Sequence, residues 1–360
     1  AGMRILHAAD FHLDSPFRGL SAEKARERRR ESRELLDRLA NLANARAVDA
    51  VLLSGDLFDS GRVYRETLER MAQSLGGIRC QVLIAPGNHD PYHSRSPYCQ
   101  VDWPANVHLF TESRISGVEF PFGIVYGAAF TAEEQAESLL AGFTAPPSDK
   151  PQVLCLHADL NPGPYNPITK EQIAASGLTY LALGHIHQYS GLQRQGETFY
   201  AYPGCPEGRG FDELGEKGAL MVEVLPGKAE AEFVPLCRRR YEILEADVTD
   251  ADPRERLEAA VAPFSTADIL RVVLTGETGE AGVDLAALET AFAHRFYSLE
   301  LRDRTRVGED IWKRAEEDSL RGLFLQELRR QYDAAGDDST RERIVRAVRF
   351  GLAAMDGRDL

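Results

Sequence analysis

Five short apolar runs in this sequence are each followed at once by side chains that bind metal ions. The runs have the length and the apolar content of buried β-strands, and they cover residues 4–9, 51–54, 81–85, 153–156 and 180–183. The segments that follow them are Asp10-Phe11-His12, Gly55-Asp56-Leu57-Phe58-Asp59, Gly87-Asn88-His89-Asp90, His157, and Gly184-His185-Ile186-His187. Ligands gather at strand ends in α/β sheets, so we expect these segments to form one site in an α/β fold.

The remainder of residues 1–240 alternates between strand and helix patterns. A helix is expected where four leucines form an apolar stripe, Leu35, Leu36, Leu39 and Leu42. In all, helices are predicted at residues 22–47, 64–75 and 131–142, and further strands at 198–205 and 219–225. This order of elements predicts a β-sandwich flanked by helices, which we expect to form one domain over residues 1–240.

Two smaller segments follow this domain. Residues 241–308 contain three strand patterns separated by two helical patterns, which predicts a small α+β domain. Residues 309–360 contain two apolar stripes at helical spacing, which predicts a helical hairpin. Ser339-Thr340-Arg341-Glu342 has the pattern of a capping box and is expected to start the second helix of this hairpin. The two stripes serve either self-packing or the binding of a partner protein.

The side chains at the five strand ends favour two metal ions. Imidazole nitrogens mixed with carboxylate and amide oxygens, without sulfur, suit Mn²⁺, Fe²⁺, Zn²⁺ or Co²⁺ better than Mg²⁺ or Ca²⁺. Two such ions about 3.5–4 Å apart stabilise the attacking and leaving oxygens of a phosphoester and lower the pKa of bound water. The sequence contains no G-x-S-x-G, P-loop or G-x-G-x-x-G motif for another chemistry. We therefore predict a phosphoesterase that attacks with a metal-bound hydroxide.

Composition limits the substrates and the compartment. The net charge of −14 argues against non-specific binding to nucleic acid, which is driven by basic surfaces, although two divalent cations at the site would offset part of it. No apolar stretch approaches the roughly 20 residues that span a bilayer, so no membrane association is expected. The five cysteines form no C-x-x-C pair. Free thiols in the cytoplasm are the simplest interpretation.

The five segments together resemble a known family. D-x-H, G-D-x-x-D, G-N-H-D, a lone His and G-H-x-H, in this order, resemble the calcineurin-like metallophosphoesterases. The segment from His7 to Phe17 resembles the start of bacterial SbcD/YhaO-type DNA repair exonucleases, as does the later segment from Tyr202 to Arg209. The resemblance covers about residues 4–205, and beyond residue 240 it lies in the layout of the domains alone.

The resemblance implies a role for each residue of the site. It assigns one metal to Asp10, His12, Asp56 and His187, and the other to Asp56, Asn88, His157 and His185. It gives the catalytic role to His89, which stabilises the transition state or protonates the leaving oxygen while Asp90 orients it. It makes Asp59 a residue that holds a metal ligand by a hydrogen bond. Arg209 is a candidate for binding a substrate phosphate.

The resemblance also implies a DNA repair nuclease, exonuclease or endonuclease, that cleaves backbone phosphodiesters with two divalent ions, Mn²⁺ first among them. The expected partner is an SMC-like coiled-coil ATPase of the SbcC/YhaN type, gripped by the C-terminal helices. The α+β domain would cap the active site, and a homodimer is expected by analogy. Two alternatives stay open. The chain is either a phosphodiesterase or phosphatase for small phosphoesters, or mainly a structural subunit of an ATPase complex.

Overall fold

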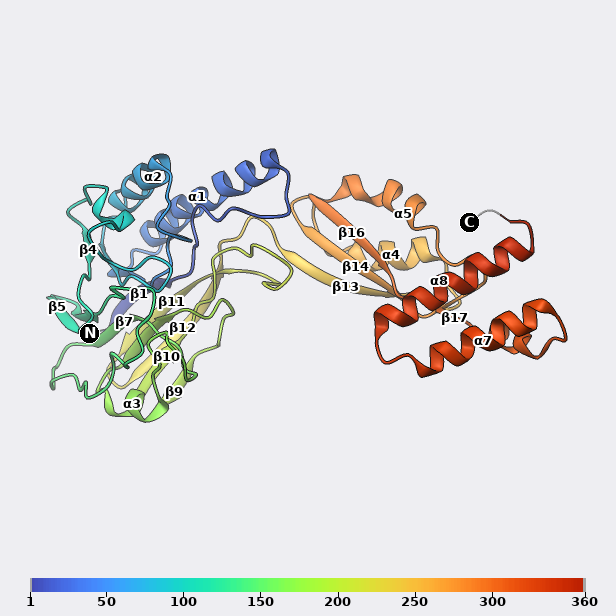
Figure 1. The fold of residues 1–360 in the computed structure, drawn as a ribbon. Helices are drawn as coiled ribbons and strands as arrows, with labels where there is room; N and C mark the ends of the chain where they lie inside the picture. The colour runs from blue at the N-terminus through green and yellow to red at the C-terminus, as the bar shows by residue number, and fades with distance from the viewer. Residues whose placement is uncertain (1, 359–360) are drawn as a thin grey trace. The chain divides into compact units, whose positions relative to one another are not determined.

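The computed structural model describes residues 2–358. They divide into two compact units, one ending at Arg238 and the other beginning at Arg239 (Figure 1). The second unit contains both the α+β segment and the C-terminal helices. The structure has one boundary between compact units, between Arg238 and Arg239. The predicted division into three parts, at residues 240 and 308, stays a prediction.

The first unit contains two six-stranded sheets. In the first sheet, β1, β2, β3 and β4 are parallel, and β11 and β12 extend it antiparallel beyond β1. The strand order is β12 (Lys228–Pro235), β11 (Gly218–Leu225), β1 (Met3–Ala8), β2 (Ala50–Leu53), β3 (Gln81–Ile84) and β4 (Val107–Leu109). Three of the five runs that precede metal-binding side chains are therefore neighbouring parallel strands.

The second sheet contains the other two runs. Strands β6, β7, β8 and β10 are parallel, with an antiparallel strand at each edge. The strand order is β5 (Ser116–Phe120), β6 (Gly123–Gly127), β7 (Gln152–His157), β8 (Tyr180–Gly184), β10 (Thr198–Ala201) and β9 (Gln193–Gln195). Together the sheets form the predicted sandwich.

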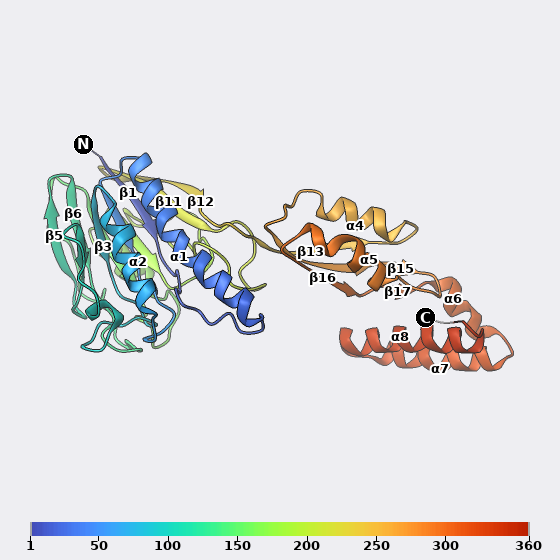
Figure 2. The same ribbon diagram turned by 90° about the horizontal axis from the view of Figure 1, so that it is seen from above.

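Side-chain alternation explains the layers. In β1, Ile5 belongs to the apolar core shared with Val153 of the second sheet, whereas Leu6 belongs to the core under the helices. Successive side chains of a strand point to opposite faces, so a strand that is apolar on both faces is covered on both. Helices α1 (Ala22–Ala45) and α2 (Arg65–Gly76) supply the outer cover of the first sheet (Figure 2), and α3 (Lys170–Ala175) lies on the second. The expected fold class is confirmed.

The helix predicted at residues 131–142 is wrong, because the structure has bends and turns there. Several of its backbone groups bond to a distant loop in place of a helical partner. The amide of Gln135 donates to the carbonyl of Pro164 at 2.7 Å, and that of Leu139 donates to Oδ1 of Asn166 at 2.7 Å. Good helix formers in this segment are thus overruled by tertiary contacts. One further short helix, η1 (Pro97–Cys99), follows β3.

The second unit begins with a three-stranded parallel sheet in the order β13 (Tyr241–Asp247), β14 (Ile269–Thr275), β16 (Ser298–Asp303). Helices α4 (Pro253–Val261) and α5 (Leu285–Phe292) share a buried core with these strands, as Leu257, Phe292 and Leu270 show. A short turn, η2 (Ala293–Arg295), and the strand pair β15 (Glu277–Thr278) and β17 (Arg306–Val307) complete this part.

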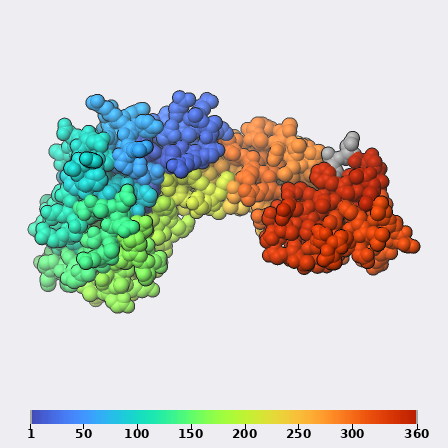
Figure 3. All heavy atoms as spheres, viewed as in Figure 1, coloured from blue at the N-terminus to red at the C-terminus, as the bar shows by residue number. Residues whose placement is uncertain are grey.

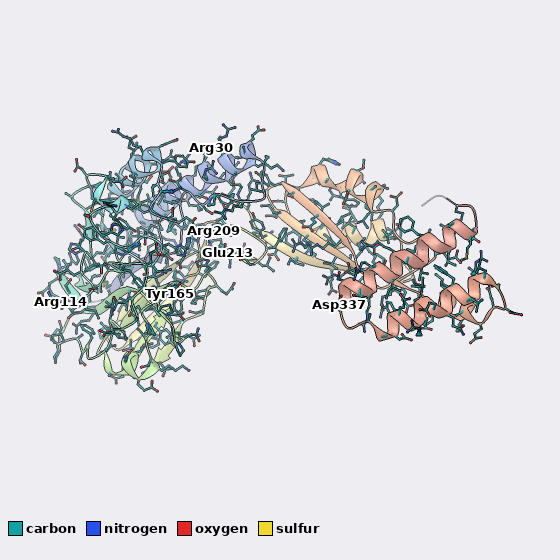
Figure 4. All side chains as sticks on the ribbon, in the orientation of Figure 1. Arg30, Arg114, Tyr165, Arg209, Glu213 and Asp337 are labelled. Carbon is teal, nitrogen blue, oxygen red and sulfur yellow. The ribbon has the colours of Figure 1, made fainter. Side chains whose placement is uncertain are left out.

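The chain ends in a helical hairpin built from α6 (Glu309–Lys313), η3 (Arg314–Glu316), α7 (Leu320–Ala334) and α8 (Asp338–Met355). Figure 3 shows its surface in red. The capping box predicted at Ser339 is wrong, since Asp337 (labelled in Figure 4) caps α8 by accepting from the amide of Thr340 at 2.7 Å. Within residues 2–358, none of the helices combines the length and apolarity required of a membrane span.

Candidate metal centre

The predicted ligands meet at one edge of the sandwich, where strands of both sheets end. Asp10 and His12 follow β1, Asp56 follows β2, and Asn88 follows β3. His157 is the last residue of β7, whereas His185 and His187 follow β8. Parallel strands deliver their carboxyl ends to the same edge, which explains how residues far apart in the sequence come together.

Asp10, His12 and His187 form the first cluster of possible ligands. Nε2 of His12 lies 3.1 Å from Nε2 of His187, which in turn lies 3.9 Å from Oδ1 of Asp10. Among the described residues, that buried Oδ1 has no hydrogen-bond partner. A buried carboxylate oxygen without a partner is costly, and two converging imidazole nitrogens beside it fit a divalent cation.

Asp56, His157 and His185 form the second cluster. Oδ2 of Asp56 lies 3.2 Å from Nε2 of His157 and 3.7 Å from Nε2 of His12. Asp56 is therefore placed between the two clusters. Oδ1 of Asn88 lies 2.9 Å from Nε2 of His157 and adds an amide oxygen to the second cluster. All seven predicted ligands thus lie together, with one carboxylate shared.

The backbone at these positions is unusual. Asp10, His12, Asp56 and His185 all have positive φ, at 59°, 47°, 50° and 124°. Such conformations cost free energy in residues other than glycine and concentrate at functional sites. Gly55, at φ +85°, precedes Asp56, and a Cβ there would lie 2.7 Å from Nδ1 of His157. The glycine is therefore needed for the close approach of the two ligand-bearing strand ends.

Each histidine predicted to be a ligand has a second contact that orients its ring. His12 Nδ1 lies 3.1 Å from Oδ1 of Asp59, as expected for that carboxylate. His157 Nδ1 lies 2.8 Å from the carbonyl of Ser54. His187 Nδ1 lies 2.6 Å from Oε2 of Glu213, and His185 Nε2 lies 3.3 Å from Oδ2 of Asp159. One ring nitrogen is thereby fixed and the other is left for a metal ion. Sequence reasoning missed Ser54, Asp159 and Glu213.

The side chains of His89 and Asp90, which are adjacent in the sequence, make different contacts. His89 is exposed at the site, with its Nδ1 3.0 Å from the carbonyl of Asp59. We expected Asp90 to orient His89, and the structure contradicts this. The buried Asp90 carboxylate accepts from the amides of Asp56 at 3.0 Å and Leu57 at 2.8 Å, and from the hydroxyl of Tyr98. Asp90 therefore fixes the loop that carries Asp56.

Burial and charge shift the pKa values of these groups. Burial raises the pKa of Asp10 to about 7 and lowers that of His12 to about 4. Burial also opposes protonation of His157, but the carboxylate of Asp56 outweighs it and raises the pKa of His157 to about 9. The buried carboxylates thus need nearby positive charge. A pair of divalent cations would supply that charge in place of protons.

Comparisons with known proteins agree with this geometry. The family model described as calcineurin-like phosphoesterase matches residues 3–189. The uncharacterized metallophosphoesterase YhaO of Bacillus subtilis is 31% identical over 268 residues, which cover 69% of this chain and 64% of that protein. The DNA double-strand break repair protein Mre11 of Methanopyrus kandleri is 28% identical over 339 residues, 86% of this chain and 72% of that protein.

A third relative, the SbcD component of the nuclease SbcCD of Escherichia coli, is 37% identical over 91 residues, 24% of this chain and 21% of that protein. The chain therefore spans less than two thirds of YhaO and about a fifth of SbcD. With the matched model extending over all five ligand-bearing segments, the chain belongs to the calcineurin-like phosphoesterases and has relatives of the SbcD/YhaO type.

Proposed function

We propose that this protein hydrolyses phosphodiesters of the DNA backbone at a site for two divalent metal ions. The observation that carries the proposal is the position of Asp56, whose Oδ2 faces His12 of one cluster and His157 of the other. A shared carboxylate between two mixed nitrogen and oxygen clusters is suited to two ions at short separation. DNA as the substrate is supported by relatives named as a DNA double-strand break repair protein and a nuclease component.

The ligands divide between the two metal positions. We assign the first position to Asp10, His12, Asp56 and His187, and the second to Asp56, Asn88, His157 and His185. The donor set favours Mn²⁺, with Fe²⁺, Zn²⁺ or Co²⁺ as alternatives. When bound, two such ions supply a hydroxide near neutral pH and stabilise the charge that develops on the phosphate oxygens.

The chain's own residues orient the substrate and move a proton. His89 is exposed beside the first cluster, with its ring centroid 5.0 Å from that of His12. The carbonyl of Asp59 can only accept, so its contact with Nδ1 makes Nδ1 a protonated nitrogen of His89. In the imidazolium form, in which Nε2 also carries a proton, His89 is suited to stabilise the transition state or to protonate the leaving 3′ oxygen from Nε2.

The second unit supports a role within a larger assembly. Leu320, Leu323 and Phe350 of the hairpin are exposed, and apolar surface of this kind marks sites of protein contact. We propose an SMC-like coiled-coil ATPase of the SbcC/YhaN type as the partner, with the α+β part of the unit as a cap. Such a partner would also supply basic DNA-binding surface, which would offset the net charge of −14 of this chain. A homodimer is a further proposal, by family analogy.

Cleavage of end-labelled linear DNA, double-stranded and single-stranded, with Mn²⁺ tests the proposal. The native protein is compared with His89→Ala and with the matched control His294→Ala, which removes an exposed histidine of the second unit. We expect His89→Ala to lower the cleavage rate by about 10²–10⁴-fold, since that is the contribution of a general acid or base. His294→Ala should cleave like the native protein. Equal cleavage by all three would contradict the role of His89, and no cleavage by the native protein would contradict hydrolysis of DNA by this chain.

The net charge of −14 favours a second candidate, hydrolysis of small phosphoesters, because an acidic surface repels DNA. Turnover of bis(p-nitrophenyl) phosphate that depends on His89, without DNA cleavage even when the ATPase partner is added, would establish this alternative.

A further inference from the structure

The segment between β10 and β11 contributes to the metal centre although it contains no predicted metal ligand. We name residues 204–213 the clamp segment. We propose that its Glu213 and Arg209 are positioning residues that set the geometry and the affinity of the first metal position and leave the second unaffected. This inference rests on the dinuclear site proposed above, and it assigns each metal position its own outer support.

Glu213 holds the imidazole of His187. Its Oε2 accepts from Nδ1 of His187 at 2.6 Å, and the carboxylate is buried in the protein. Its other oxygen, Oε1, accepts from the amide of Arg209 at 3.0 Å and faces Nε of the same arginine at 3.6 Å. The carboxylate therefore fixes the ring orientation of His187 and makes Nε2 the nitrogen that faces the cluster. A carboxylate that accepts from Nδ1 also makes the imidazole a stronger metal ligand.

Arg209 extends this support to the other histidine of the same position. Its terminal nitrogen donates to Oδ1 of Asp59 at 3.0 Å and to Oγ of Ser15 at 3.3 Å. Oδ1 of Asp59 in turn accepts from Nδ1 of His12 at 3.1 Å. His187, Glu213, Arg209, Asp59 and His12 thus form a connected chain of contacts around one metal position. Figure 4 labels Arg209 and Glu213.

The second metal position has different supports. His157 is held by the carbonyl of Ser54 at 2.8 Å, and His185 faces Asp159 at 3.3 Å. Ser54 directly follows β2, and Asp159 lies after β7. Because the hydrogen bonds of Glu213 and Arg209 lead to His187 and His12, loss of the clamp should weaken one position selectively.

Helix α1 anchors the clamp segment. Arg28 of this helix is fully buried, and its guanidinium donates to the carbonyl of Gly208 at 3.1 Å and lies 3.7 Å from Oε2 of Glu207. Oε1 of Glu207 also accepts from the amide of Arg238 at 2.5 Å. Arg30, two residues along the helix, has a side chain that is 63% exposed. Helix α1 thus contains both a solvated arginine and the arginine that holds the clamp segment.

Binding of Mn²⁺, measured by calorimetric titration and by metal analysis after equilibrium dialysis, tests the inference without any activity assay. The native protein is compared with Glu213→Gln, which keeps the size of the side chain and removes its charge. The matched control is Glu216→Gln, at a glutamate just beyond the clamp segment. Two Mn²⁺ ions per chain are expected in the native protein and in the control.

In Glu213→Gln we expect one position to bind about 10–100-fold more weakly, the usual effect of removing such an outer contact, and the other to keep its native affinity. Arg209→Gln should weaken the same position through Asp59. Thermal unfolding of the metal-free proteins checks that each variant folds.

Two results would overturn the inference while the metal centre stands: unchanged affinity at both positions, or equal weakening of both. A native protein that binds no Mn²⁺ would overturn the dinuclear centre and, with it, this inference. The rescue variant Glu213→Asp, with its charge retained on a shorter side chain, should recover part of the lost affinity. If Glu213→Asp bound Mn²⁺ as weakly as Glu213→Gln, this result would also count against a role of the charge.

Discussion

The metal centre and the C-terminal hairpin place polar and apolar groups in opposite environments. At the metal centre, Asp10 and His157 are buried, whereas on the hairpin Leu320 and Phe350 are 74% and 63% exposed. Each arrangement is unfavourable for the isolated chain, because buried charge needs a counter-charge and exposed apolar surface needs an apolar cover. Two cations would complete the first region from within, whereas the proposed partner protein would cover the second. Under these proposals, the first region is a site for chemistry and the second a site for assembly.

The largest effect is expected where the metal positions share a ligand. Asp56→Asn keeps the side-chain size but removes the charge that both positions use, so we expect loss of phosphodiester hydrolysis and weaker Mn²⁺ binding at both positions. Asp333→Asn, at an aspartate of α7 whose side chain is 63% exposed, is the matched control and should behave like the native protein in DNA cleavage and in metal titration. Native activity in Asp56→Asn would remove the basis for a shared carboxylate.

A pair of leucines on α7 tests whether the exposed apolar groups are needed by the isolated chain. Leu325 is fully buried and Leu323 is 65% exposed. Leu325→Ala should lower the free energy of unfolding by about 2–5 kcal/mol, because it leaves a cavity, whereas Leu323→Ala should change it by less than about 0.5 kcal/mol. Urea unfolding followed by circular dichroism measures both. Comparable losses would show that Leu323 serves the fold and not a partner.

Metal ions should stabilise one unit alone. Mn²⁺ at 100 times its dissociation constant is expected to raise the free energy of unfolding of the first unit by about 2.7 kcal/mol for each position that it fills, since the predicted ligands lie in that unit. Hydrogen exchange, followed by mass spectrometry, should show added protection in β1 and β7 and none in α7 and α8. Metal-free buffer with a chelator provides the reference state. Equal protection of both units would contradict the assignment of the ligands.

The smallest expected effect concerns acid stability. His7 is buried in β1, with Nδ1 2.7 Å from the hydroxyl of Tyr180, and burial lowers its pKa to about 3. The unfolded chain binds a proton there below about pH 6.5, so stability is complete above that pH and is lost as the pH falls toward 3. The slope is about 1.4 kcal/mol per pH unit. His7→Gln should show a shallower decline in metal-free urea unfolding between pH 6.5 and 5. An identical slope would exclude His7 as a source.

The predicted metal ligands could be found from the sequence because each lies at or shortly after the end of a strand. Asp10 comes two residues after β1, and His157 is the last residue of β7, so local spacing was enough to predict that they converge. The three strands of the second unit were predicted for the same reason, since their apolar alternation is local. The assignment of each ligand to a metal ion stays a prediction.

Hydrogen bonds between residues far apart in the chain could not be predicted from local sequence patterns. Glu213 supports His187 from 26 residues away, and Asp90 bonds to the loop of Asp56 from 34 residues away. Nothing in the sequence around either carboxylate indicates its partner. The segment at residues 131–142 failed similarly, because Asn166 and Pro164 take its amides. Arg209 was named from the sequence as a candidate for binding a substrate phosphate, and it lies near the site. Its contact with Asp59 could only be seen in the structure.

Anomalous scattering from a crystal of the protein grown with Mn²⁺ would test the central claim most directly. The account predicts two anomalous peaks, both touching Asp56, with His12 and His187 at one and Asn88, His157 and His185 at the other. A single peak, or peaks away from these side chains, would contradict the dinuclear centre and the function proposed from it.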